Sequence, residues 1–287
     1  MLALVLTTAL SMAIPRVFGA ADLYEISSPL FGRMRVNKLD SQSRMLYFFG
    51  IWEPAITRLV TEQLRPERIF VDVGANLGYY SLIAGRQLSA LNGHVISFEP
   101  SPSLFQRLEG HVQLNDLTNV TLHQVAVADA AGTLPLYIGS ARNLGTTSLV
   151  AGDNLTLEAD VAVDSLATLL SASEIRRVQL IKIDVEGAER LVLLGMAAIL
   201  DDLADDAGLL VELSKEPLDA AGATPRDLFA PFHERGFRFF AIPNSYEPGF
   251  YLRDPGSHRS SEVRFNDLDR HVTRLHDFYV SRQEPVI

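Results

Sequence analysis

The sequence predicts an α/β fold in which buried strands alternate with amphipathic helices. Short apolar runs rich in β-branched residues recur along the chain, which is typical of strands covered on both faces. Apolar residues at helical spacing follow several of these runs. Two of the runs, at 69–73 and 178–183, lead into glycine-containing turns, the geometry in which backbone N–H groups and a helix N-terminus meet a ligand.

Composition limits the function classes. With 287 residues, 47% of them hydrophobic, the chain can bury a full core as one large domain or as one domain with an extension. A net charge of −10 argues against a nucleic-acid partner, since phosphate binding needs clustered Lys and Arg. The absence of cysteine excludes disulfides and thiolate metal sites. Small molecules, glycans and lipids remain as partners.

The N-terminus carries an apolar run from Leu2 to Pro15, followed by small residues at 19–21. This pattern is similar to a signal peptide, but no Lys or Arg precedes the run. The run is also shorter than the roughly 20 apolar residues that span a bilayer. We therefore expect no stable membrane span and a cytoplasmic location, with export or membrane association left open.

The elements expected along the chain follow from periodicity and turn residues. Residues 22–50 read as a partly β lead-in, and a helix begins at Pro54, a residue suited to a first turn. The later elements are a strand at 69–73, a helix at 79–88, a strand at 94–98, a helix at 103–114, a strand at 120–129, a β insertion at 133–163, a strand at 178–183, a helix at 188–203, a strand at 208–213, a helix at 225–235, a strand at 237–242 and a closing amphipathic helix at 266–282.

The turn after the first of the two glycine-flanked strands contains Gly74 and Gly78. A dinucleotide-binding turn would read G-x-G-x-x-G. Here Asn76 stands two residues after Gly74, and Tyr79 follows Gly78, so that fingerprint fails. A glycine turn that serves only strand-to-helix packing is the alternative to a ligand site.

The segment V-D-V-G-A-N-x-G at 71–78 resembles motif I of the class I S-adenosylmethionine-dependent methyltransferases, in the form carried by the FkbM family. Four other segments also resemble FkbM motifs: G-x-x-E-P at 50–54, F-E-P-x-P at 98–102, N-x-G-x-x-S-L at 143–149 and I-K-I-D-V-E-G-A-E at 181–189. The resemblance implies a Rossmann-like, doubly wound, mostly parallel sheet in a domain at 50–287, preceded by an N-terminal extension at 1–49. It also implies S-adenosylmethionine as cofactor and O-methylation of a small-molecule, glycan or lipid-like hydroxyl.

Carried over to this sequence, the resemblance places Asp72, Gly74, Asn76 and Gly78 at the cofactor. Glu99 lies twenty-one residues beyond Gly78, and nucleotide-binding folds place a ribose-binding acid about 20 residues after the glycine loop.

Asp129 follows the third strand, where class I methyltransferases often keep an acid that binds the adenine amino group. We favour this cofactor-binding role for Asp129, although the Ala-Ala-Gly that follows also makes it a plausible turn residue.

The acceptor is expected on the other side of the site. The polar, glycine-containing loop at 142–149 is interpreted as a substrate-side loop, with Asn143 and Thr147 as binding residues. Trp52 and Glu53 either border the site or serve as a core tryptophan and a helix cap.

Asp184 and Glu186 are the candidate catalytic residues, because they follow a buried strand that is expected to adjoin the first one. The three residues 182, 184 and 186 would share one face if that strand persisted. The carboxylates either hold the cofactor's positive charge or accept the proton of the acceptor hydroxyl. The structural alternative is an internal Lys182–Asp184 pair, with Glu186 favouring the positive end of the next helix.

A metal site is not predicted. Asp184 and Glu212 offer oxygen ligands suited to Mg²⁺, but the spacing gives no third ligand. The histidines show no metal-ligand spacing, and His271 and His276 are expected on the surface of the closing helix. Two rival functions are a non-catalytic S-adenosylmethionine- or nucleotide-binding module and a nicotinamide-dependent oxidoreductase, the latter opposed by the failed glycine fingerprint.

Overall fold

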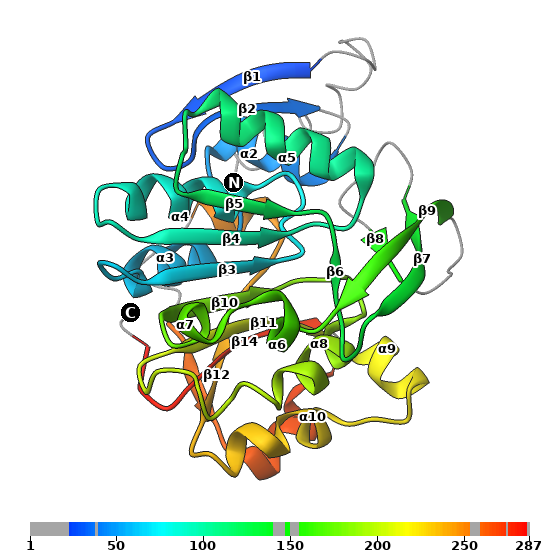
Figure 1. Ribbon diagram of the computed structural model, residues 1–287. Coiled ribbons are helices and arrows are strands. Elements are labelled where there is room, and N and C mark those ends of the chain that lie inside the picture. Colours follow the sequence, from blue (N-terminus) through cyan, green and yellow to red (C-terminus); the bar gives the residue numbers. More distant parts are fainter. Residues whose placement is uncertain are drawn as a thin grey trace.

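A computed structural model describes residues 23–37, 40–139, 147–149, 155–252, 259–273 and 275–285, and a central eight-stranded sheet organises them (Figure 1). The five strands from β11 to β5 are parallel to one another, whereas β14 runs antiparallel to both of its neighbours. In spatial order the strands are β13 (Ser261–Val263), β12 (Arg238–Ile242), β14 (Leu275–Ser281), β11 (Gly208–Ser214), β10 (Val178–Ile183), β3 (Ile69–Val73), β4 (His94–Phe98) and β5 (Val120–His123).

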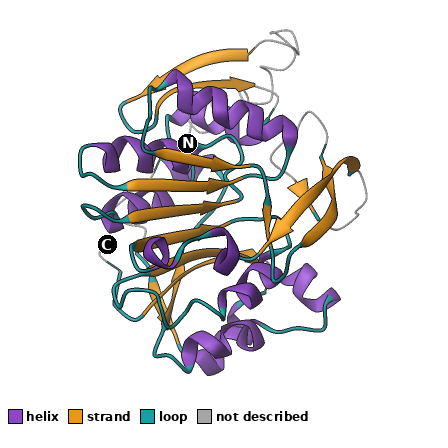
Figure 2. Ribbon diagram, viewed as in Figure 1, coloured by secondary structure: helices purple, strands orange, loops and turns teal. Residues whose placement is uncertain are grey.

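Helices cover both faces of this sheet, as Figure 2 shows, and each face has its own hydrophobic core. Strand β3 illustrates the division: Ile69, Val71 and Val73 enter the first core, whereas Phe70 enters the second. The first core lies under α6 (Leu166–Leu169), α7 (Ala172–Ile175), α8 (Glu189–Met196), α9 (Lys215–Ala220), α10 (Pro225–His233) and α12 (Leu268–His271). The second lies under α2 (Ser41–Phe49), α3 (Pro54–Gln63), α4 (Tyr79–Ser89) and α5 (Pro102–Leu114). The expected doubly wound, mostly parallel α/β fold is confirmed.

The N-terminal part described here is a hairpin of β1 (Leu23–Ser28) and β2 (Gly32–Asn37), followed by α2. Phe31, Met34 and Val36 are buried in the second core together with residues of α3 and α4. The boundary predicted at residue 49 therefore falls between two helices that share one core. No helix within the described ranges is long and apolar enough to cross a membrane, and the apolar run at 2–15 lies outside them.

The β insertion is a separate four-stranded sheet in the order β6-β9-β7-β8, which confirms the expectation for 133–163. Figure 1 shows it beside the carboxyl ends of β3 and β4. Its strands are β6 (Ala126–Val127), β7 (Gly132–Ile138), β8 (Thr147–Ser148) and β9 (Thr156–Asp164). The single strand expected over 120–129 was wrong: the chain leaves the central sheet after His123, and Ala126 pairs instead with Val163 of β9.

The helix predicted over 266–282 was also wrong. A 3₁₀ turn (η2, Phe265–Asp267) and the short α12 lead into β14, which is inserted between β11 and β12. Its alternate residues are apolar on both faces, with Phe278 and Val280 in the first core and Tyr279 in the second. A strand buried on both faces lacks the polar alternation that would distinguish it from a helix. His276 consequently lies half-buried in this strand, with its ring centroid 5.1 Å from that of His271.

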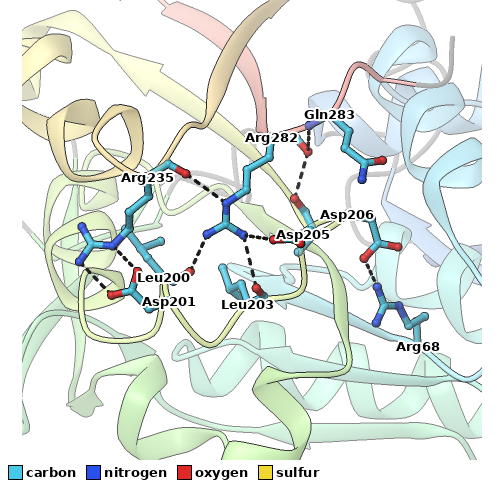
Figure 3. Close-up of polar contacts among 11 residues, drawn as sticks. Arg68, Leu200, Asp201, Leu203, Asp205, Asp206, Arg235, Arg282 and Gln283 are labelled. Atoms are coloured by element: carbon cyan, nitrogen blue, oxygen red, sulfur yellow. Dashed lines mark hydrogen bonds and ion pairs between the residues drawn. The ribbon is translucent and has the colours of Figure 1, made fainter.

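Arg282 anchors the end of β14 (Figure 3). Its guanidinium lies 4.4 Å from the centre of the Phe237 ring and donates to the carbonyls of Leu200 (3.1 Å) and Arg235 (3.2 Å). Nearby, Arg235 forms an ion pair with Asp201. Helix α8 ends at Met196, earlier than expected, and the turns that follow it supply one of these carbonyls. A single side chain thus ties the antiparallel strand to two connecting segments.

Candidate active site

A cavity of about 610 Å³ opens where the carboxyl ends of β3, β4, β10 and β11 meet the β insertion. Ligands of open α/β sheets bind at this edge, and pockets for small molecules and cofactors have volumes of about 300–1,000 Å³. The lining residues come from both sides of the central sheet's carboxyl edge, from α2 and from the insertion. Most of the residues singled out from the sequence are found here.

The glycine turn brings two strand ends into contact. Gly74 has φ +81°, and a Cβ atom there would lie only 1.9 Å from the backbone oxygen of Asp184. No other residue could occupy this position without moving β3 and β10 apart. Gly74 and Asn76 line the cavity, whereas Gly78 does not; at Gly78 a Cβ would collide with Leu108 of α5. The left-handed backbone of Gly78, with φ +87°, and this packing together account for the second glycine.

Glu99 is a buried carboxylate at the end of β4 that faces the cavity. Its Oε2 accepts the backbone N–H of Asn76 at 2.7 Å, and its Oε1 accepts that of Ser101 at 2.9 Å. Burial raises the pKa of Glu99 to about 7, although both backbone hydrogen bonds oppose the rise. A carboxylate fixed in this way still has lone pairs available to hydroxyl donors in the cavity.

Asp72 lies beneath the cavity rather than in its wall. Its carboxylate accepts the hydroxyl of Ser81 at 2.6 Å, and Ser81 lies 2.8 Å from the hydroxyl of Ser97. Burial raises the pKa of Asp72, and Lys182, opposite it on β10, lowers it. The structure thus gives Asp72 a supporting place under the glycine turn.

The remaining sequence-predicted binding residues have different outcomes. Thr147 in β8 lines the cavity, together with Ser148 and Leu149. Asn143 lies outside the described residues. Asp129 is exposed and is not part of the cavity wall, because the chain has already turned into the insertion. The walls nearby are apolar instead, formed by Val125, Ala126, Val127 and Leu136.

Polar residues occupy the carboxyl edge of the sheet on the face that carries the second core. Along β10, Leu180 of that core is followed two residues later by Lys182, and along β11 Leu210 is followed by Glu212. Asp277 lies opposite Glu212 on β14. Because side chains two residues apart in a strand lie on the same face, the apolar face that forms the second core ends, at the carboxyl edge of the sheet, in a cluster of ionisable groups.

Asp184 follows β10 and faces the cavity with 27% of its side chain exposed. Its Oδ2 accepts the ammonium of Lys182 at 2.7 Å, and this ammonium lies 4.7 Å from the centre of the Tyr80 ring. Burial acts to lower the pKa of Lys182, but the carboxylates of Asp184, Glu53 and Asp72 outweigh it and raise that pKa. The structure thus contains the internal pair and also places the carboxylate at the cavity.

Glu186 also lines the cavity, but not as a continuation of the strand. Strand β10 ends at Ile183, so residues 182, 184 and 186 do not form one alternating face. Glu186 adopts φ +50°, a left-handed backbone that is uncommon outside glycine. Burial, reinforced by the charges of Asp184 and Glu189, raises the pKa of Glu186 to about 8.

Tyr246 and Asn244 were missed from the sequence, and Glu53 was left undecided. Glu53 is 2% exposed, and Tyr80, Tyr246 and Asn244 donate to it at 2.7, 2.9 and 3.2 Å. Tyr246 and Asn244 follow β12, whose carboxyl end lies at the same edge of the sheet as the other site residues. Their place directly after a predicted strand was the sequence feature that could have identified both residues.

The cavity wall is strongly acidic. Among the described residues, Arg44 is the only lysine or arginine in it, and seven carboxylates line it: Asp40, Glu53, Glu99, Asp184, Glu186, Glu212 and Glu247. No group of three or more His, Asp or Glu within the described part of the chain is arranged to hold a metal ion. The wall therefore favours ligands that carry positive charge or hydroxyl donors.

The family model and the relatives that match this chain are all described as methyltransferases. A family model described as the methyltransferase FkbM domain matches residues 72–239. Methyltransferase 1 of Beauveria bassiana is 29% identical over 178 residues, which cover 55% of this chain and 69% of that protein. Hexuronic acid methyltransferase AglP of Haloferax volcanii is 25% identical over 61% of this chain and 66% of its own length. The 31-O-demethyl-FK506 methyltransferase FkbM of Streptomyces tacrolimicus is 26% identical over 47% of this chain and 61% of its own. The matches thus span roughly two thirds of each relative's length.

Proposed function

Because this chain belongs to the FkbM methyltransferase family, we propose that it transfers the methyl group of S-adenosylmethionine to a hydroxyl oxygen of a small molecule or glycan. The observation that carries this proposal is one cavity that joins Glu99, behind the glycine turn, to the carboxylates Asp184 and Glu186. The names of two relatives, a hexuronic acid methyltransferase and a 31-O-demethyl-FK506 methyltransferase, support oxygen as the atom methylated.

The residues present fit the cofactor. Glu99 offers a buried carboxylate to the ribose hydroxyls, and the tight approach at Gly74 leaves backbone, not side chain, against the ligand. The apolar residues Val125 and Val127 would form the wall against the adenine ring. The bound cofactor would supply an electrophilic methyl group on a positively charged sulfur.

Asp184 would place negative charge beside that sulfur, and the positive sulfur would in turn lower the raised pKa of Glu186 and favour its ionised form. The ammonium of Lys182 donates a hydrogen bond to the carboxylate of Asp184 and holds that carboxylate in place. Methyl transfer from a sulfonium needs mainly alignment of the two reacting atoms, and a rigid charged wall supplies that alignment.

Calorimetric titration with S-adenosylmethionine tests the cofactor site. Glu99→Ala removes a charged hydrogen-bond acceptor worth about 1.5–3 kcal/mol, so affinity should fall by roughly 10–100-fold. Asp129→Ala, which changes an exposed residue outside the cavity, should bind like the wild type. Unchanged affinity in Glu99→Ala would refute the ribose assignment.

The rival functions predict different titrations. Binding of S-adenosylmethionine without methyl transfer to any hydroxyl probe would favour a non-catalytic binding module. Binding of NADH in its place would favour an oxidoreductase. The proposal requires S-adenosylmethionine binding together with release of S-adenosylhomocysteine when a hydroxyl acceptor is supplied.

A further inference from the structure

The hydroxyl of Tyr246 bridges two carboxylates in the wall of the cavity. Tyr246 is 44% exposed, and its ring is stacked on that of Trp52, with centroids 5.0 Å apart and 17° between the planes. Its oxygen lies 2.9 Å from Oε1 of Glu53 and 3.2 Å from Oε2 of Glu212. The ring stacking and the two contacts fix the hydroxyl at the surface of the cavity.

Glu53 is the buried member of this group. It precedes α3 with φ +43° and ψ +73°, a left-handed backbone that is unfavourable for a residue other than glycine. The tertiary contacts that hold it there are hydrogen bonds: Tyr80 donates to Oε2, and Tyr246 and Asn244 donate to Oε1. Three donors on one carboxylate are the environment of an ionised group.

The number of protons in this group follows from the contacts. The single hydroxyl proton of Tyr246 can serve only one of its two carboxylate neighbours. If it is donated to Glu53, the contact with Glu212 requires that Glu212 carry a proton and donate it to the tyrosine oxygen. Burial, reinforced by Asp184 and Asp277, raises the pKa of Glu212 to about 11, which agrees with a protonated side chain. The resting order is therefore Glu212 carboxyl, Tyr246 hydroxyl, Glu53 carboxylate.

We propose that Tyr246 accepts the hydroxyl proton of the methyl acceptor and passes its own proton to Glu53. This inference rests on the proposed methyl transfer. The acceptor oxygen forms its bond to the methyl carbon as the carbon–sulfur bond breaks, and that bond's electron pair stays on sulfur. The acceptor's proton moves to the oxygen of Tyr246, and the former hydroxyl proton of Tyr246 moves to Oε1 of Glu53. Tyr246 ends neutral, and Glu53 ends as a neutral carboxylic acid.

The surroundings favour this direction of proton flow. Titratable groups face Glu53 from three neighbouring strands or the turns after them: Lys182, Asp184 and Glu186 from β10 and its turn, Glu212 from β11 and Asp277 from β14. Burial is the largest influence on Glu53 and raises its pKa; Lys182 and the tyrosine hydroxyls oppose it, and Asp184 adds to it. Protonation thus relieves a buried charge. Asp184 is a poorer destination because its carboxylate already holds the ammonium of Lys182.

Three variants test the kinetic part, with methyl glycosides as the hydroxyl probes and S-adenosylhomocysteine release as the signal. Tyr246→Phe keeps the ring that stacks on Trp52 and removes only the hydroxyl. We expect kcat to fall by about 10²–10³-fold, within the span of general acid–base contributions, with cofactor affinity unchanged. Tyr47→Phe is the matched control, because Tyr47 is 42% exposed, close to the exposure of Tyr246, and does not line the cavity. Its kcat should match the wild type.

The pH profile separates proton acceptance from a structural role. Wild-type kcat should fall as pH is lowered through the raised pKa of Glu53, since a protonated Glu53 can take no further proton. Glu53→Gln should have a low kcat without that acidic limb. The proposal would be overturned if Tyr246→Phe had the same kcat and the same pH profile as the wild type.

Infrared difference spectroscopy of the cofactor-free protein tests the proton order without any turnover. At neutral pH the wild type should show a protonated-carboxyl C=O band that disappears in Glu212→Gln, shifts in Tyr246→Phe and is unaltered in Tyr47→Phe. Absence of that band from the wild type would overturn the relay even if methyl transfer is confirmed. Failure of the wild type to bind S-adenosylmethionine would instead refute the proposed function and leave the infrared result standing.

Discussion

Replacing Glu99 by glutamine should change how the stability of the cofactor-free protein depends on pH. The Glu99 pKa is about 7 in the folded protein and 4.5 in its ordinary state. A folded pKa above the unfolded one means that this group contributes stability below about pH 4.5 and loses it as pH rises to about 7. At about 1.4 kcal/mol per pKa unit, the loss is about 3 kcal/mol. Glutamine cannot titrate, so the variant lacks this loss.

The measurement is urea unfolding of both proteins at about pH 4 and about pH 8, which lie on either side of that window. Trp52 is the only tryptophan and reports the transition by fluorescence. Other raised carboxyls, such as Glu186 and Glu189, titrate in both proteins and cancel in the difference. The wild-type advantage over Glu99→Gln should shrink by about 3 kcal/mol between the two pH values. An equal advantage at both would show that Glu99 is not a strained buried carboxylate.

Three further predictions concern the acceptor side and the sheet. Asp184→Asn should lower kcat by about 10²–10³-fold, because it removes negative charge beside the sulfur; a large fall in Tm with kcat retained would show that the residue only pairs with Lys182. Thr147→Ala should raise the acceptor KM and leave calorimetric cofactor affinity unchanged, and loss of cofactor binding would move β8 to the other half of the site. Arg282→Lys keeps the charge but not the planar fork that reaches several carbonyls, so urea unfolding should show a loss of about 2–3 kcal/mol; unchanged stability would contradict the anchoring role seen in Figure 3.

The central strands were predictable because they obey rules that act locally. Strands β3, β4, β10 and β11 are continuous apolar runs bounded by turns, and each forms at or near its expected residues. Strand β14 could not be assigned in this way. Leu275 and Tyr279 have the spacing of a helix face, and only the gap between β11 and β12 selects the extended form.

Residues predicted from motifs that are contiguous in sequence come together in one cavity. Gly74, Glu99 and Asp184 each directly follow a parallel strand whose carboxyl end meets the others, and Glu186 lies in the turn after β10. The partners of Glu53 come from separate elements, α4 for Tyr80 and the segment after β12 for Asn244 and Tyr246, so no local pattern links them.

Asp129 shows the reverse case. Its expected place depended on a strand that stays in the central sheet, and the chain instead crosses to the insertion after His123. Apolar residues therefore line the cavity where the Asp129 carboxylate was expected.

A crystal structure of the protein with S-adenosylhomocysteine tests the central claim most directly. The account predicts ribose hydroxyls within hydrogen-bonding distance of the Glu99 carboxylate, adenine against Val125 and Val127, and sulfur directed toward Asp184 and Tyr246. A cofactor product bound outside this cavity, or inside it with the ribose away from Glu99 and the sulfur away from the acidic wall, would contradict it.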